Sequence, residues 1–118
     1  MADEPGGTWA RQLRTGLLDL AILRHLADGP VHGYALISAL KRQGLMAPDG
    51  GEATVYQALQ RLARLDLAAF EWSRPRDGDE RPRKLYTLTR RGRQALGQMA
   101  KDWHAVRDAL DQLLETPA

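Results

Sequence analysis

The residues best suited to chemistry are polar side chains that recur at helical spacing within residues 52–65. Apolar side chains form one stripe of this segment, while the remaining faces carry hydroxyl, amide and guanidinium groups. Groups of these types reach base edges and phosphates when a helix lies in the DNA major groove. The candidate DNA-contacting residues of this segment are Thr54, Tyr56, Gln57, Gln60, Arg61 and Arg64. A solvated helix face is the alternative interpretation, and the segment taken alone favours it.

Positive charge is concentrated in the twenty residues from 74 to 93. Eight Arg and Lys side chains oppose three carboxylates there, so this segment carries a net charge of +5, whereas the rest of the chain carries −3. The whole-chain charge of +2 hides this concentration. An Arg-rich hairpin beside a polar helix is the electrostatic footprint of a protein that binds a polyanion, and Arg suits a narrow minor groove. The segment therefore favours DNA binding over an Arg-rich loop that only aids solubility.

The hydropathy pattern predicts the elements that must position these groups. Apolar residues recur with a period near 3.6 in residues 9–26, 33–42, 52–65 and 90–115, which predicts helices. The period changes to two in residues 68–73 and 84–88, which predicts a β-hairpin around a Gly-, Pro- and Asp-rich turn. Three helices followed by a hairpin form a winged helix-turn-helix, whose third helix reads DNA and whose hairpin is the wing.

The expected fold is therefore mainly α with a small β-hairpin. It comprises a flexible N-terminal arm over residues 1–8 and a winged helix-turn-helix domain over residues 9–89. A long C-terminal dimerisation helix over residues 90–116 completes it.

The C-terminal helix carries a narrow apolar seam along its whole length. Its apolar residues recur at alternating spacings of three and four, as in a coiled coil. A helix of this length spans roughly 39 Å, about the diameter of the domain, so a narrow seam on it can run beyond what the domain covers. A second copy of the chain is the simplest cover, which predicts a two-fold homodimer. The predicted interface residues are Leu96, Met99, Trp103, Val106, Leu110 and Leu113.

Trp103 has two interpretations that the residues leave open. In a two-fold dimer, paired Trp103 rings with Met99 could line an apolar slot that accepts a flat aromatic molecule. Trp9, at the start of the first helix, could close the same slot. These three residues form the possible ligand-binding set. The alternative is that Trp103 only fills space in the interface.

Several functional classes are not supported by the sequence. The chain has no cysteine, so disulfides, zinc fingers and thiolate nucleophiles are absent, and the three histidines match no metal-ligand spacing. No nucleophile motif, phosphate-cradling loop or carboxylate pair indicates catalysis, so we expect no catalytic residue, no metal and no cofactor. Neither a signal peptide nor a membrane span is indicated, which predicts a cytoplasmic protein without a membrane partner. DNA binding would place it on the cell's DNA.

Three segments of the chain resemble the PadR family of bacterial transcriptional regulators, particularly its short members. They are Gly-Pro-Val-His-Gly-Tyr at residues 29–34, the helical segment at residues 53–62, and Arg-Lys-Leu-Tyr-Thr-Leu-Thr-Arg-Arg-Gly at residues 83–92. The likeness extends over about residues 13–115. It implies a winged-helix homodimer that binds a palindromic operator in double-stranded DNA. It also implies a repressor that leaves DNA when an inducer binds.

The same resemblance assigns roles to particular residues. It implies that Thr54 and Tyr56 contact DNA, and that some small members hold aromatic drugs at a position matching Trp103. Two positions depart from the family pattern, because Ala53 stands where Gly is common and Gln57 where Pro is common. The wing residues implied to contact the DNA backbone or minor groove are Arg81, Arg83 and Lys84.

The leading hypothesis is a homodimeric, ligand-responsive transcriptional repressor. Two alternatives come from other functional classes. One is a winged-helix module that binds an acidic protein partner, and the other is an architectural protein that binds DNA without sequence preference.

Overall fold

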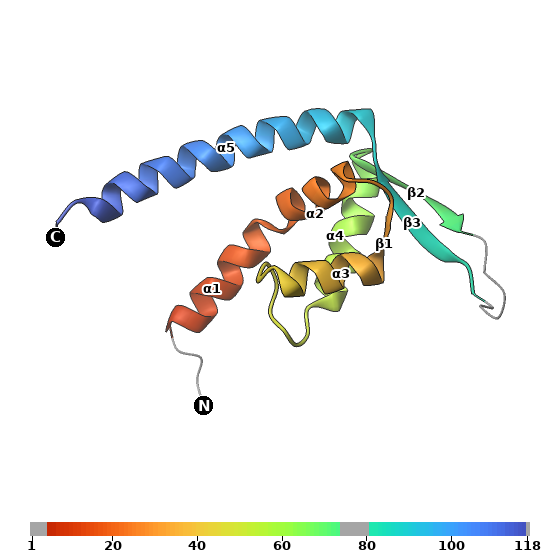
Figure 1. The fold of residues 1–118 in the computed structure, drawn as a ribbon, viewed down its shortest axis with the longest axis horizontal. Helices are drawn as coiled ribbons and strands as arrows, with labels where there is room; N and C mark the ends of the chain where they lie inside the picture. The colour runs from red at the N-terminus through yellow and green to blue at the C-terminus, as the bar shows by residue number, and fades with distance from the viewer. Residues whose placement is uncertain (1–4, 74–80, 118) are drawn as a thin grey trace.

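The computed structural model describes residues 5–73 and 81–117, in which five helices and three strands follow one another (Figure 1). This order matches the expected winged helix-turn-helix with its long last helix, and the mainly α fold is confirmed. The elements are α1 (Pro5–Gly16), α2 (Leu18–Ala27), β1 (Val31–His32), α3 (Gly33–Arg42), α4 (Glu52–Arg64), β2 (Ala68–Ser73), β3 (Arg83–Leu88) and α5 (Arg90–Glu115).

The N-terminal region differs from the prediction in two respects. The single helix expected over residues 9–26 is divided into α1 and α2 at Leu17, whose φ of −100° and ψ of 1° are not helical. Gly16, a poor helix former, immediately precedes this break. In addition, α1 begins at Pro5, so residues 5–8 of the predicted flexible arm are helical. Proline is favoured in the first turn of a helix because it has no N–H to leave unpaired.

The core lies between α2, α3, α4 and the sheet. Each helix contributes one stripe of residues spaced three or four apart, and β2 and β3 add Ala68 and Tyr86. The largest fully buried side chains are Ile22, Leu23, Leu36, Leu40, Val55, Leu59 and Leu62. These stripes fix the angle between α3 and α4, and they leave the opposite face of α4 to solvent.

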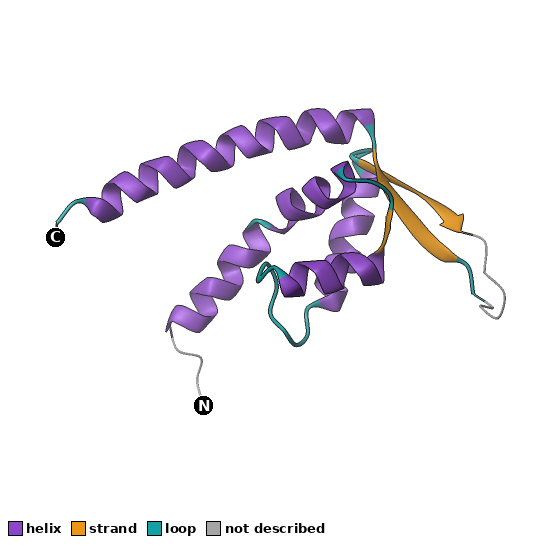
Figure 2. Ribbon diagram, in the orientation of Figure 1, coloured by secondary structure: helices purple, strands orange, loops and turns teal. Residues whose placement is uncertain are grey.

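The wing is part of a three-stranded antiparallel sheet in the order β1–β3–β2. The expected hairpin is confirmed, with Ala68 opposite Leu88 at its base and Ser73 opposite Arg83 at its outer end. The sheet lies at one end of the molecule, and the hairpin projects away from the helices (Figure 2). The Gly-, Pro- and Asp-rich turn predicted between the two strands lies outside the described residues.

Strand β1 was not predicted. It has only two residues, which is too short to produce a hydropathy period, and it pairs Val31 with Tyr86 and His32 with Leu85. The His32 Nδ1 atom also lies 3.1 Å from the Lys84 carbonyl oxygen. The start of α3 is thereby attached to the wing.

Helix α5 begins at a well-defined cap. The Thr89 hydroxyl oxygen accepts a hydrogen bond from the Gly92 N–H at 2.8 Å, and the hydroxyl donates to the Asp66 carbonyl oxygen at 2.6 Å. Gly92 is buried, and its backbone packs directly on the Leu67 carbonyl. These contacts make Thr89 the N-cap of α5, and they join α5 to the turn between α4 and β2.

From this anchor α5 runs over α2 and continues past the core (Figure 1). Leu96 and Met99 pack against the core, whereas Val106, Leu110 and Leu113 are 54%, 48% and 67% exposed. The single chain thus leaves the outer half of the predicted seam uncovered. Within residues 5–73 and 81–117, no helix has both the length and the apolar character that crossing a lipid bilayer requires.

Candidate nucleic-acid interface

Helix α4 presents its predicted polar residues to solvent. Val55, Ala58, Leu59 and Leu62 form the buried stripe that holds α4 on the core. Because side chains three and four apart share a helix face, the residues between these positions point outward. All six predicted α4 residues are exposed, namely Thr54, Tyr56, Gln57, Gln60, Arg61 and Arg64.

Two ion pairs at the surface connect α4 to its neighbours α2 and α3. The Arg61 guanidinium donates to the Asp19 carboxylate of α2 at 2.5 Å, and the Lys41 ammonium of α3 pairs with Glu52 at 2.5 Å. The hydrogen bond from Lys41 holds the pKa of Glu52 below its usual value. Arg61 therefore takes part in the contact between α2 and α4, which separates it from the other predicted α4 residues.

A groove lies between the start of α3, helix α4 and the wing. Tyr56 and Gln60 enter it from α4, while Arg83 and Lys84 enter it from β3. Residues predicted on two separate elements are thus brought to one surface. His32, Gly33, Tyr34, Trp72 and Tyr86 complete the lining.

Lys84 is held in this groove by aromatic rings of β2. Its ammonium lies 4.3 Å from the centroid of the Phe70 ring and 5.6 Å from that of Trp72. Such cation–π contacts place the charge without neutralising it. The Phe70 and Trp72 rings meet edge to face, with centroids 6.1 Å apart, and both side chains are largely exposed.

Sequence reasoning missed these two aromatic residues as part of the site. The available signal was their alternation on one face of β2, where large apolar side chains remain exposed on a strand next to basic residues. An exposed apolar patch of that kind indicates a contact surface.

Tyr86 forms the floor beneath the groove and was also missed. It is 4% exposed, and its ring centroid lies 5.8 Å from that of Phe70. Burial raises the pKa of the Tyr86 phenol, and the nearby Tyr56 raises it further. Tyr86 therefore stays neutral. It packs against Phe70 and lies near Tyr56.

The remaining predicted wing residues lie along the outer part of β3 and just before it. Arg81 and Arg83 are exposed, and Lys84 is half-buried against the aromatic rings. Other residues that contribute to the basic segment, Arg74 and Arg76, lie outside the described residues.

The predicted ligand-binding residues occupy two different helices. Trp103 is half-buried on α5, and Met99 packs against the core one turn earlier. Trp9, on α1, is 63% exposed.

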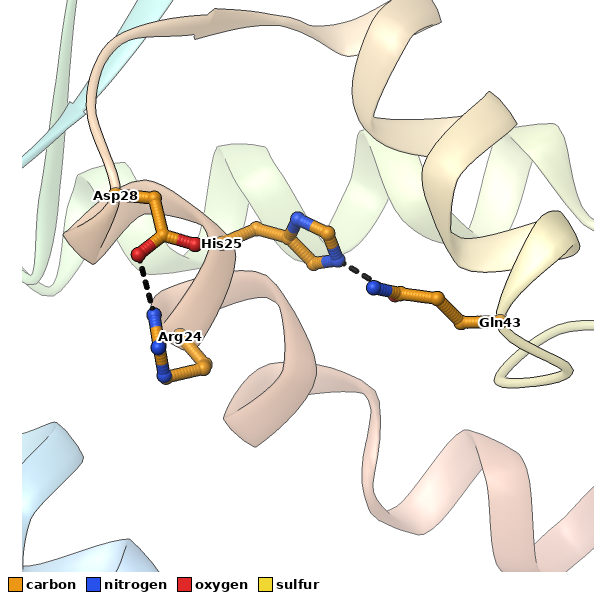
Figure 3. A network of polar contacts seen from close by, with 4 residues as sticks. All are labelled: Arg24, His25, Asp28 and Gln43. Atoms are coloured by element: carbon orange, nitrogen blue, oxygen red, sulfur yellow. Dashed lines mark hydrogen bonds and ion pairs between the residues drawn. The ribbon is translucent and has the colours of Figure 1, made fainter.

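Two of the three histidines make contacts between elements. The His25 Nε2 atom lies 2.7 Å from the Gln43 amide oxygen, which links the end of α2 to the end of α3 (Figure 3). Next to His25 in α2, Arg24 donates to Asp28 at 2.7 Å and lowers the pKa of that carboxyl. His32 contacts the Lys84 carbonyl oxygen.

In the part of the chain that the structure describes, no group of three or more His, Asp or Glu side chains is placed to hold a metal ion.

The fold and this surface define a class of protein, the winged helix-turn-helix proteins that contact DNA with an exposed helix and a basic wing. The family model "Transcriptional regulator PadR-like family" matches residues 22–98. The chain belongs to this family, whose members are DNA-binding transcriptional regulators rather than enzymes. The resemblance inferred from the three segments is confirmed.

Individual relatives agree with this assignment. The transcriptional regulator Rv3488 of Mycobacterium tuberculosis is 37% identical over 86 residues, which cover 73% of this chain and 75% of the relative. The crystal structure of a PadR family transcriptional regulator from Eggerthella lenta is 33% identical, with a TM-score of 0.77 over 90% of this chain and 88% of that one. A PadR-like transcriptional regulator from Bacillus cereus is 24% identical, with a TM-score of 0.77 over 90% of this chain and 99% of that one, and supports the fold.

Proposed function

We propose that this chain acts as a homodimeric repressor that recognises a palindromic operator. The observation that carries the proposal is the groove in which Tyr56 and Gln60 of α4 face Arg83 and Lys84 of the wing. An exposed polar helix and a basic hairpin on one surface match the major groove and the adjacent phosphates of one DNA half-site. Such a protein would reside on the nucleoid.

The residues on this surface divide into two roles. Thr54, Gln57 and Arg64 share the exposed side of α4 with Tyr56 and Gln60, and side chains of these types suit base edges and phosphates. Arg81, Arg83 and Lys84 place positive charge beside the DNA backbone or in the minor groove. Arg61 is assigned to holding α4 against Asp19, with any DNA contact secondary.

The proposed dimer follows from the uncovered half of α5. Val106, Leu110 and Leu113 form a row of exposed apolar side chains on one face of this helix. Burial of such a row against the same row of a second copy gives a two-fold interface, and PadR regulators are generally dimeric. Two copies of α4 would then read half-sites separated by one helical turn of DNA, about 10 base pairs, or a multiple of it.

The proposed inducer site lies on the same interface. Trp103 is half-buried on the α5 seam, and in a two-fold dimer its copy could stand opposite it with Met99 nearby. A flat aromatic molecule between two such rings would change the spacing of the two α4 helices and thereby release DNA. Trp9 is the candidate to close the slot from α1.

Selection of genomic DNA fragments by the purified protein tests the function. The proposal predicts that the recovered fragments share an inverted repeat and that one of them lies next to a gene that the protein represses. Recovery of fragments without a common sequence would instead favour an architectural DNA-binding protein. Absence of DNA recovery together with capture of an acidic protein would favour the interaction module.

Fluorescence titration tests the inducer. In a variant with Trp9→Phe and Trp72→Phe, Trp103 is the remaining tryptophan of the three. An acridine dye should quench its emission and weaken operator binding at the same concentrations. Unchanged emission across a panel of planar aromatic dyes would assign Trp103 to packing alone.

A further inference from the structure

Gly33 lies directly against the ring of Tyr56. It is the buried first residue of α3, and a Cβ built on its backbone would lie 2.6 Å from Tyr56 Cε1. The same Cβ would lie 3.3 Å from Cζ and 3.4 Å from the phenol oxygen. The outer edge of the Tyr56 ring therefore occupies the space that any side chain at position 33 would fill.

The backbone of Gly33 does not itself require glycine. The residue is helical, and it is not among the glycines with positive φ, which are Gly29, Gly44, Gly50 and Gly51. Alanine is a better helix former than glycine at such a position. The contact with Tyr56 is thus the structural feature that a side chain at position 33 would disturb.

The Tyr56 ring lies between this contact and open solvent. Its side chain is 42% exposed, and it lies in the groove beside Lys84 and above the buried Tyr86. Solvent on the open side leaves the ring free to turn if the space beside Gly33 is lost. A tyrosine hydroxyl donates to a DNA phosphate only when the ring points it there, because hydrogen bonds weaken steeply with angle.

We propose that Gly33 is a positioning residue for DNA recognition. Because Gly33 has no side chain, the Tyr56 ring packs against its backbone, and this packing points the phenol hydroxyl at a DNA phosphate. The inference rests on the proposed DNA contact of Tyr56. It assigns to the first helix of the helix-turn-helix a direct part in orienting a contact made by the second.

The variant Gly33→Ala tests the positioning role. The group displaced is the outer edge of an exposed ring, so the thermal midpoint should stay at or slightly above that of the wild type. Operator affinity should fall about tenfold for each copy of Tyr56 in the complex, the size expected when a hydrogen bond to a charged group is lost. A purely structural role would instead lower the thermal midpoint. Gly97→Ala on α5, where a Cβ meets nothing within 4 Å, is the matched control and should keep full affinity.

A double-mutant cycle with Tyr56→Ala separates this effect from other causes. If Gly33 acts through Tyr56, adding Gly33→Ala to Tyr56→Ala should cause no further loss of operator affinity. A loss in that background equal to the loss in the wild-type background would overturn the inference. If the wild-type protein binds its operator and the single variant Gly33→Ala binds it with the same affinity, the inference is overturned and the proposed function stands.

One measurement requires no variant. A nuclear Overhauser contact between the Gly33 Hα and Tyr56 Hε protons is expected in the wild-type protein. Its absence would contradict the packing of the Tyr56 ring against Gly33. Absence of any operator binding by the wild type would overturn both the inference and the proposed function.

Discussion

Tyr56 and Lys84 reach the groove from different elements, and each is held by a neighbour without charge. Tyr56 rests on Gly33, and Lys84 rests on the rings of Phe70 and Trp72. Neither contact uses the Tyr56 hydroxyl or the Lys84 ammonium as a hydrogen-bond donor. Both side chains are therefore held in position while their polar groups can still donate hydrogen bonds to DNA.

The replacement Lys84→Gln should weaken DNA binding through loss of charge. Each phosphate contact by a cation contributes about −0.9 to the slope of log affinity against log salt concentration. The variant should therefore reduce the magnitude of this slope by about 0.9 for each copy of Lys84 in the complex. Fluorescence anisotropy at several salt concentrations measures it. Lys101→Gln, which removes an exposed lysine of α5, is the control, and an equal change there would refute a specific role for Lys84.

Tyr86 should make the stability of the protein sensitive to alkaline pH. A phenol whose pKa is raised by folding stays neutral to higher pH in the folded state than in the unfolded chain. Its contribution is complete below its ordinary pKa near 10 and is lost as the pH rises above that value. Urea unfolding at pH 8 and pH 10.5 should show a larger loss for the wild type than for Tyr86→Phe. Equal losses in the two proteins would contradict this assignment.

At the scale of elements, the orientation of α5 depends on one close backbone contact. A Cβ at Gly92 would lie 1.9 Å from the Leu67 carbonyl oxygen, which is backbone and cannot rotate away. Thr89 caps the same turn and bonds to Asp66. The path of α5 away from the wing is thus set within its first turn.

Gly92→Ala should destabilise the protein by about 1–3 kcal/mol, because the added methyl group forces the start of α5 away from Leu67. Gly97→Ala, on the same helix in open space, should be neutral or stabilising by about 0.5–1 kcal/mol. Chemical denaturation monitored by circular dichroism measures both. A stable Gly92→Ala protein would show that α5 is not anchored at this turn.

The sequence was sufficient to predict the elements that have strong boundary signals. Helix Arg90–Glu115 follows a threonine cap and carries one continuous seam, and helix Gly33–Arg42 lies between Gly-Pro and Gln-Gly, so both were predicted to the residue. The break at Leu17 and the strand Val31–His32 were missed. Apolar residues continue through the break, and two residues carry no period.

The same distinction applies to the site. Periodicity alone identified the exposed side of α4, because the pattern of buried residues determines which side chains remain outside. The contacts that hold Tyr56 and Lys84 join elements that are distant in sequence. Gly33 and Tyr56 are brought together only when α3 packs on α4, which no local pattern reports.

At the scale of the whole molecule, one chain is an extended body with a long axis of 61 Å. The wing lies at one end, and the far end of α5 projects from the other (Figure 1). Val106, Leu110 and Leu113 on that projecting half keep about half or more of their surface exposed in the single chain. A second copy would cover them and present two DNA-contacting surfaces.

The double replacement Leu110→Glu and Leu113→Glu should convert the proposed dimer to a monomer. Carboxylates on the seam would have to lose water on association without a charged partner, which is costly. Analytical ultracentrifugation should give twice the chain mass for the wild type and the chain mass for the variant. Gln112→Glu, which adds a carboxylate at an exposed neighbouring position, should remain dimeric. A wild-type protein that sediments as a monomer would refute the dimer.

We propose that α4 and the wing together recognise a specific DNA sequence. The most direct test is titration of the wild-type protein onto a selected inverted repeat and onto a scrambled duplex of equal length and composition, over a range of salt concentrations. We expect affinity for the repeat roughly a thousandfold or more above that for the scrambled duplex, with a steep fall as salt rises. Equal affinity for the two duplexes, or affinity that does not respond to salt, would contradict it.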